Sequence, residues 1–123
     1  MENELNICMR ENKFSIVAMH HHIIPIPGTG RERNILNDAG DILHSLITHE
    51  VGIVIGGHKH VPHLYQMDRT LFVNAGSLSS YKLRGKEVNS YNTINVTDNN
   101  IEIYLNKLDG NKLLLGNFQK HII

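Results

Sequence analysis

Residues 51–60 read VGIVIGGHKH, and this stretch decides the fold class of the chain. Its first five residues form a short apolar run with β-branched members, which is typical of a strand buried on both faces. Residues 14–19 (FSIVAM) form a similar run, and the three histidines at 20–22 follow it directly. The sequence therefore contains two expected strands, and each of them is followed by histidines.

A helix is expected between these two strands. Apolar residues recur at a helical period from Ile35 to Ile47. Residues 23–33 (IIPIPGTGRER) are predicted to be a loop because prolines, glycines and charges interrupt any regular pattern. A strand, a helix and a second strand form a βαβ unit, in which both strands are parallel and end at the same edge of the sheet.

The remaining sequence predicts shorter strands in a β meander. These strands are expected at 63–67, 71–73, 91–96 and 101–105, with turns at 68–69 and 98–100. Residues 1–13 show no clear period and are expected to be at most the frayed end of a helix. We therefore predict an α/β fold in one domain that spans residues 1–123.

Composition excludes several classes of protein. The chain has 123 residues, of which 41% are hydrophobic and 20% are charged, so it is globular rather than disordered. Twelve basic residues balance twelve acidic ones, which argues against binding to nucleic acid or to a membrane surface. Cys8 is the one cysteine, and the chain does not open with a secretory signal pattern. These features predict a cytoplasmic protein.

The histidines are the candidate functional residues. The chain has nine, and His20, His58 and His60 follow the two expected strands at the edge where ligands bind in α/β sheets. Adjacent strands lie about 4.8 Å apart, so three imidazoles at this edge are able to converge on one metal ion. With nine histidines, random placement gives an H-x-H pair roughly 0.6 times per chain, so the alternative that these histidines bind no metal stays open.

The same residues resemble a known family. VAMHHH at 17–22, the proline at 25, GHKH at 57–60 and NAGS at 74–77 look like the second half of the calcineurin-like metallophosphoesterases. The resemblance covers about residues 14–105 and implies the carboxyl-terminal half of a four-layer αββα sandwich. It further implies that His20 and His58 are ligands of one metal ion of a binuclear centre, and that His60 is a ligand of its partner.

The chain departs from this family in its missing motifs. D-x-H, G-D-x-x-D and G-N-H, which supply the bridging carboxylate and the histidine for the leaving group, are absent. Gly40-Asp41 lies in the helix pattern without the second Asp, and Asp38, Asp41 and Asp68 are expected to be solvated. Without anionic bridging ligands we expect at most one ion of Mn, Fe, Zn or Ni.

The resemblance implies metal-dependent hydrolysis of a phosphomonoester or phosphodiester, and we expect this chain to be inactive alone. The alternative is a non-catalytic half-domain that binds one metal ion or a partner. The expected partner is the amino-terminal half of the phosphoesterase domain or a second copy of the chain, because strands that are apolar on both faces need cover.

Overall fold

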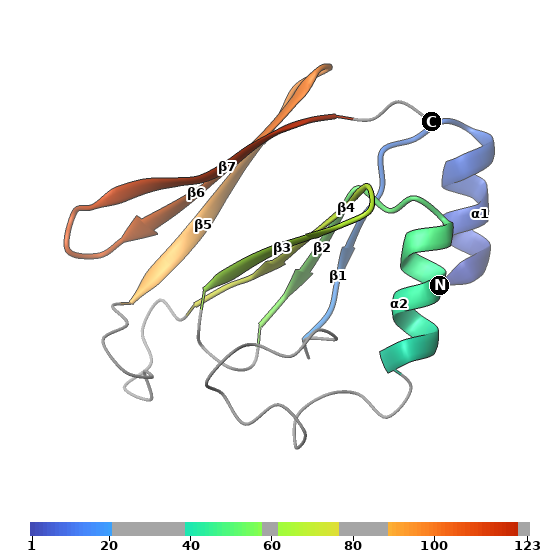
Figure 1. Cartoon of the computed structure of the whole chain (residues 1–123), viewed down its shortest axis with the longest axis horizontal. Helices are drawn as coiled ribbons and strands as arrows, with labels where there is room; N and C mark the ends of the chain where they lie inside the picture. Colours follow the sequence, from blue (N-terminus) through green and yellow to red (C-terminus); the bar gives the residue numbers. More distant parts are fainter. Residues whose placement is uncertain (21–38, 58–61, 77–88, 121–123) are drawn as a thin grey trace.

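The computed structural model describes residues 1–20, 39–57, 62–76 and 89–120. Within these residues the chain forms two helices and seven strands (Figure 1). The elements, in order, are α1 (Glu2–Arg10), β1 (Ile16–Ala18), α2 (Ala39–Thr48), β2 (Ile53–Gly56), β3 (His63–Met67), β4 (Thr70–Asn74), β5 (Ser90–Val96), β6 (Asn100–Lys107) and β7 (Lys112–Gln119).

The strands form two sheets. Sheet A has the order β1-β2-β4-β3, in which β1, β2 and β4 are parallel and β3 is antiparallel to β4. Sheet B has the order β5-β6-β7 and is antiparallel throughout. The predicted parallel pair of the βαβ unit is therefore confirmed, and so is a meander near the end of the chain.

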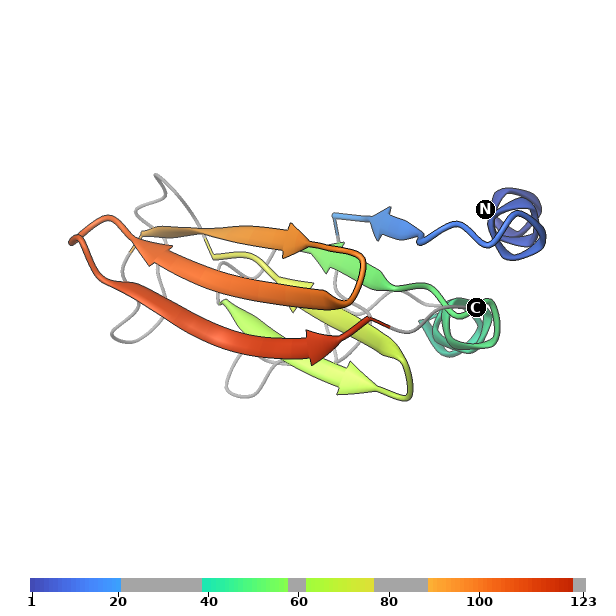
Figure 2. The same ribbon diagram turned by 90° about the horizontal axis from the view of Figure 1, so that it is seen from above.

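Three layers lie side by side (Figures 1 and 2). The two helices cover one face of sheet A, where Leu46 of α2 packs in a cluster with Val54 and Phe72. Sheet B covers the other face, where Ile53 and Ile103 are fully buried. These layers match part of the predicted αββα sandwich. In the described residues, the outer face of sheet B carries no helix.

The first helix is tied to the second by polar contacts. The Ser45 hydroxyl donates a hydrogen bond to a Glu2 carboxylate oxygen at 3.0 Å, and the Nε2 atom of His49 lies 3.1 Å from Oδ1 of Asn6. Leu5 is the buried residue of α1 and reaches the cluster under sheet A. The amino-terminal residues therefore form a helix that packs in the helical layer, rather than the frayed helix end that the sequence predicted.

The prediction that residues 14–19 form a strand buried on both faces was wrong. β1 has three residues, and both Ile16 and Ala18 are exposed. β1 lies at the end of sheet A, and among the described residues no strand pairs with its outer edge and sheet B does not cover the face that carries Ile16 (Figure 2). An apolar run in the sequence does not show whether other residues of the same chain bury both faces of the strand.

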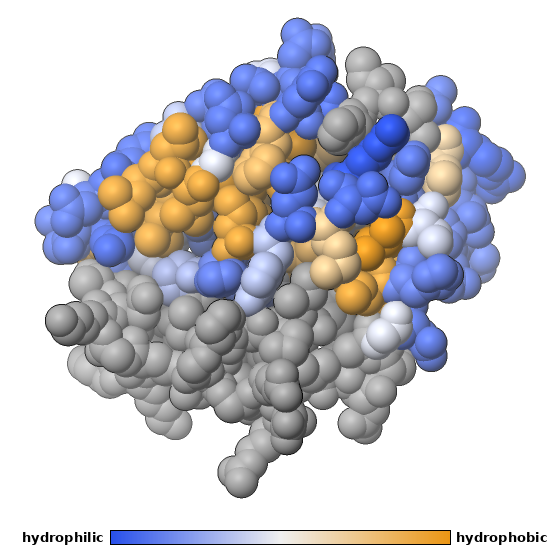
Figure 3. Space-filling view, in the orientation of Figure 1, coloured by the Kyte–Doolittle hydropathy of each residue, from blue (hydrophilic) through white to orange (hydrophobic). Residues whose placement is uncertain are grey.

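The last strand, β7, was not predicted. It carries an irregularity opposite Ile103 and Tyr104, where Leu115 has no register partner. Its outer end extends past sheet A, which leaves Leu113 and Leu114 exposed (Figure 1). Figure 3 shows apolar side chains gathered over this part of the molecule.

None of the described helices is long and apolar enough to span a membrane.

Candidate functional site

The carboxyl ends of β1, β2 and β4 meet at one edge of sheet A, as the βαβ prediction requires. The backbone pairing continues past the strands. The N–H of Met19 donates to the carbonyl of Ile55 at 2.8 Å, and the N–H of Gly57 donates to the carbonyl of His20 at 3.1 Å. On the other side, the N–H of Ala75 donates to the carbonyl of Gly56 at 2.9 Å. These bonds place His20 beside Gly57.

One of the three predicted metal ligands lies within the described residues and two lie outside them. His20 is described and lies on the exposed side of this edge. His58 and His60 lie outside the described residues, as do His21 and His22. His58 follows Gly57 directly in the sequence, and Gly57 is bonded to His20. The meeting of the two histidine-bearing strand ends is therefore confirmed, and coordination stays a prediction.

Gly57 and Gly76, which follow β2 and β4 at this edge, differ in the space around them. The position that a Cβ atom would occupy at Gly57 lies 3.8 Å from the carbonyl oxygen of His20, with no closer neighbour among the described residues. Gly76, after β4, is tightly packed: a Cβ there would lie 2.7 Å from the Ser90 hydroxyl and 3.2 Å from Pro62. The chain thus passes close to β5 after β4, whereas the described residues leave space at Gly57 after the end of β2.

Two polar residues share this edge and were not predicted as site residues. Asn74 ends β4 and is 5% exposed, and His63 begins β3 as its register partner. The His63 ring lies 4.3 Å from the Tyr65 ring, centroid to centroid, at an interplanar angle of 51°. Burial raises the pKa of the Tyr65 phenol above its ordinary value. In the sequence, the polar residue at the end of each of these two strands was the feature from which their position at this edge could have been predicted.

The carboxylates do not gather at this edge in the described part of the chain. Asp41 lies exposed in the first turn of α2, and Asp68 lies exposed in the turn between β3 and β4, where its φ of 55° is tolerated by aspartate. Both therefore occupy the solvated positions expected of them. No group of three metal-binding side chains occurs among the residues that the structure describes.

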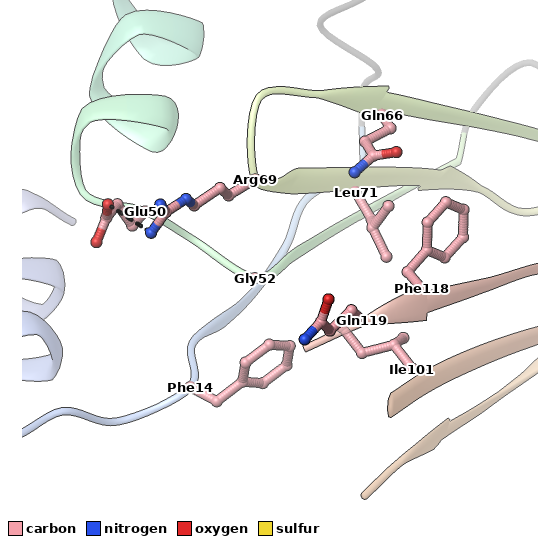
Figure 4. A pocket seen from close by; sticks show the side chains of 9 residues that line it. All are labelled: Phe14, Glu50, Gly52, Gln66, Arg69, Leu71, Ile101, Phe118 and Gln119. Carbon is pink, nitrogen blue, oxygen red and sulfur yellow. Dashed lines mark ion pairs between the residues drawn. The ribbon is translucent and has the colours of Figure 1, made fainter. Parts of the chain in front are cut away.

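A small cavity lies at the opposite edge of sheet A, between the two sheets (Figure 4). Phe14 and Phe118 line its apolar side, and the ion pair of Arg69 with Glu50 at 3.7 Å lies at its rim. The cavity has room for about one water molecule. It lies at the amino ends of the parallel strands, at the opposite edge from His20. We therefore do not assign the candidate metal site to it.

Comparison with known proteins supports the fold. No protein-family model and no curated protein matches the sequence. A structure from Streptococcus pneumoniae, described as a predicted phosphoesterase, has a TM-score of 0.54 and 23% identity over 68% of this chain and 48% of its own. GAP50, the anchor in the inner membrane complex of Plasmodium, has a TM-score of 0.71 and 18% identity over 99% of this chain and 41% of its own.

A third match is Vps29 of Entamoeba histolytica in complex with Zn²⁺, with a TM-score of 0.51 and 21% identity over 81% of this chain and 60% of its own. The chain spans less than two thirds of each of these three proteins. At such identities the likeness concerns the fold alone. The chain therefore has a part of the calcineurin-like metallophosphoesterase fold.

Proposed function

We propose that the chain is part of a metal-dependent phosphoesterase, a hydrolase of phosphomonoesters or phosphodiesters. The observation that carries this proposal is the hydrogen bond from Gly57 to the carbonyl of His20, since it joins two strand ends that are each followed by histidines. Ligands bind at this edge of α/β sheets. The similar structure from Streptococcus pneumoniae, described as a predicted phosphoesterase, supports the choice of reaction.

The donor set fits one divalent transition metal ion. His20, His58 and His60 offer imidazole nitrogens, which suit Zn, Ni or Fe, and Mn remains a candidate. The zinc bound to one Vps29 structure supports such an ion in this fold. When bound, the ion would polarise the phosphoryl group and lower the pKa of water. The chain contributes the backbone bond between His20 and Gly57, which holds two ligand-bearing segments together.

Zinc titration of the purified chain tests this proposal. We expect at most one tightly bound ion per chain, because three imidazoles without a bridging carboxylate do not hold two cations. Replacement of His20, His58 or His60 by alanine should each weaken zinc binding by about 100-fold or more, since even the hydrogen-bond partners of metal ligands contribute about 10- to 100-fold. Isothermal titration calorimetry and elemental analysis give affinity and stoichiometry.

His44→Ala is the matched control for these variants, because His44 is exposed on α2 and away from the edge. It should leave zinc affinity unchanged. Two tight ions per chain would contradict the single-ion site. Equal zinc affinity in the wild type and in all three ligand variants would remove the site altogether.

The second candidate function is a non-catalytic half-domain that binds a partner. The edge of β1 favours it, because no strand in the described part of the chain pairs with this edge, and Ile16 on β1 is 50% exposed. An edge strand presents unpaired backbone groups. GAP50 is named as an anchor rather than as an enzyme, which also supports it. The partner is either a second copy of the chain or a polypeptide that carries the missing motifs.

If the chain associates through β1, the mass of the particles in solution should increase with protein concentration. The wild-type chain should self-associate at micromolar concentration, and Ile16→Lys should shift it toward monomer because a charge at an edge strand opposes pairing. Ile7→Lys, at a 44% exposed position on α1, is the matched control and should not change the size. Light scattering over a dilution series measures this. A wild-type chain that stays monomeric and unfolds cooperatively would argue against the open edge as a docking surface.

A further inference from the structure

We propose that Ser90 and Asn92 bind one buried water molecule between the two sheets. Both residues lie on β5, the first strand of sheet B. The proposal rests on two buried side-chain oxygens that have no hydrogen-bond partner among the described residues. It is independent of the proposed phosphoesterase function, because it involves none of the candidate metal ligands.

The strand register places both side chains on the inner face of sheet B. Side chains two residues apart point to the same face of a strand. Ile94, two residues beyond Asn92, packs in the cluster between the sheets and is the register partner of Ile103. Ser90 and Asn92 therefore point toward sheet A, and Leu105, the register partner of Asn92, is buried. Two polar side chains thus continue an apolar row.

The contacts of Asn92 fix the orientation of its amide. The Nδ2 atom donates a hydrogen bond to the carbonyl of Tyr104 at 3.1 Å. A carbonyl oxygen only accepts hydrogen bonds, so the amide atom that faces it is the nitrogen and the other atom is the oxygen. This Oδ1 atom is buried and has no partner among the described residues. It therefore needs a hydrogen-bond donor from elsewhere.

The hydroxyl of Ser90 has the same need. Ser90 is 2% exposed, and its Oγ atom has no partner in the described part of the chain. A buried hydroxyl without a hydrogen bond costs free energy. A Cβ atom at Gly76 would lie 2.7 Å from this Oγ atom and 3.2 Å from Cδ of Pro62. Any side chain at residue 76 would therefore take the space beside the hydroxyl, and glycine leaves it open.

One water molecule satisfies both oxygens. Alternate residues of a strand lie about 6.6 Å apart. Two hydrogen bonds of about 2.8 Å to the same water span up to about 5.6 Å, so side chains that lean slightly toward each other reach it. Water donates to Oδ1 of Asn92 and either donates to or accepts from the Ser90 hydroxyl. Buried waters in proteins bind in this way to polar groups that have no other partner.

The chemistry of the pair favours water over a cation. Ca²⁺ and Mg²⁺ take about six or more oxygen ligands, and carboxylates are usual among them. Glu102 is the acidic residue of the neighbouring strand β6, and it alternates with the buried Ile101 and Ile103. Its carboxylate therefore points to the outer face of sheet B, where it accepts a hydrogen bond from the Tyr104 hydroxyl at 2.6 Å.

Urea unfolding of the full chain with Ser90→Ala tests the proposal. If a water binds both oxygens, the substitution removes one of its partners, and the equilibrium constant for unfolding should rise about three- to tenfold, the net value of one hydrogen bond. If no ligand binds, the substitution removes an unpartnered buried hydroxyl, and the constant should fall. A fall in the constant therefore overturns the proposal.

A double-mutant cycle shows whether the two residues share the ligand. Asn92→Leu removes the amide oxygen and also the bond to Tyr104, so its own effect does not isolate the water. In the Asn92→Leu background, however, Ser90→Ala should have an effect at least about threefold smaller than in the wild type. Effects that multiply independently would show that no ligand joins the two residues.

Thr70→Val is the matched control. The Oγ1 atom of Thr70 is also buried without a partner among the described residues, and the residue is 1% exposed. Thr70 lies on β4, where no second such atom occurs in the described part of the chain. Its replacement by valine should leave the unfolding constant unchanged or lower it, because a lone hydroxyl has no second group with which to share a water.

A crystal structure of the wild type gives a readout that does not depend on the variants folding. It should contain one water within hydrogen-bond distance of Oγ of Ser90 and Oδ1 of Asn92, and Ser90→Ala should lose that water. A protein group bonded to both oxygens would overturn the proposal. An unfolding constant that changes when Na⁺ replaces K⁺ at equal ionic strength would also overturn it, because the site would then hold a cation.

Discussion

The 123-residue chain alone should hydrolyse a generic phosphodiester at least about 100-fold more slowly than the same chain mixed with a polypeptide that carries D-x-H, G-D-x-x-D and G-N-H. The chain has none of these motifs, so it lacks the implied bridging carboxylate and the proton donor for the leaving group. General acid catalysis alone contributes about 10²- to 10⁴-fold. Release of nitrophenol from bis-nitrophenyl phosphate with Mn²⁺ measures the rate.

The control for this comparison is the same mixture with His58→Ala in the chain. That mixture should fall back toward the rate of the isolated chain, because the added polypeptide cannot replace a ligand that follows β2. Robust manganese-dependent turnover by the verified chain alone would show that the missing motifs are not needed. Such a result would move the reaction onto residues that this chain itself contains.

Replacement of Ile103 by alanine should lower the free energy of unfolding by about 2–5 kcal/mol. Ile103 is fully buried on β6 and packs in the cluster that joins sheet B to sheet A, together with Ile53 and Val73. The truncation removes buried methyl groups and leaves a cavity between two sheets whose strands restrict relaxation. Urea unfolding followed by circular dichroism measures the change.

Leu108→Ala is the matched control for the core variant. Leu108 follows β6 and is 55% exposed, so its truncation should change the free energy of unfolding by less than about 0.5 kcal/mol. If the Ile103 variant loses less than about 1 kcal/mol, the two sheets are not held together by this cluster.

The sequence predicted the elements whose signal is local. The β3 strand was predicted with the observed bounds, because polar turn residues at Asp68 and Arg69 separate two short strand patterns. β2 was predicted within two residues at either end, and its burial follows from an unbroken apolar run. The meeting of His20 with Gly57 followed from the handed connection of βαβ units, which a helical period between two apolar runs is enough to indicate.

The remaining features depend on contacts that a pattern does not contain. α1 has nine residues and buries only Leu5 fully, which is too short a stripe for its period to be detected. In β7 three leucines in a row and the irregularity at Leu115 hide the alternation. The register pairing of His63 with Asn74 was not predicted, because the turn and the packing determine strand register together.

The pairing of β1 with β2 has a kinetic consequence. Ile16 lies beside Ile53, far along the chain, whereas β5, β6 and β7 are neighbours in sequence as well as in space. Contacts between distant residues form slowly because closing the intervening loop costs entropy. We expect the meander and the β3–β4 hairpin to form early and β1 to dock late, so the edge that carries His20 is completed only after the transition state. A metal ion bound there would then slow unfolding and leave the refolding rate unchanged.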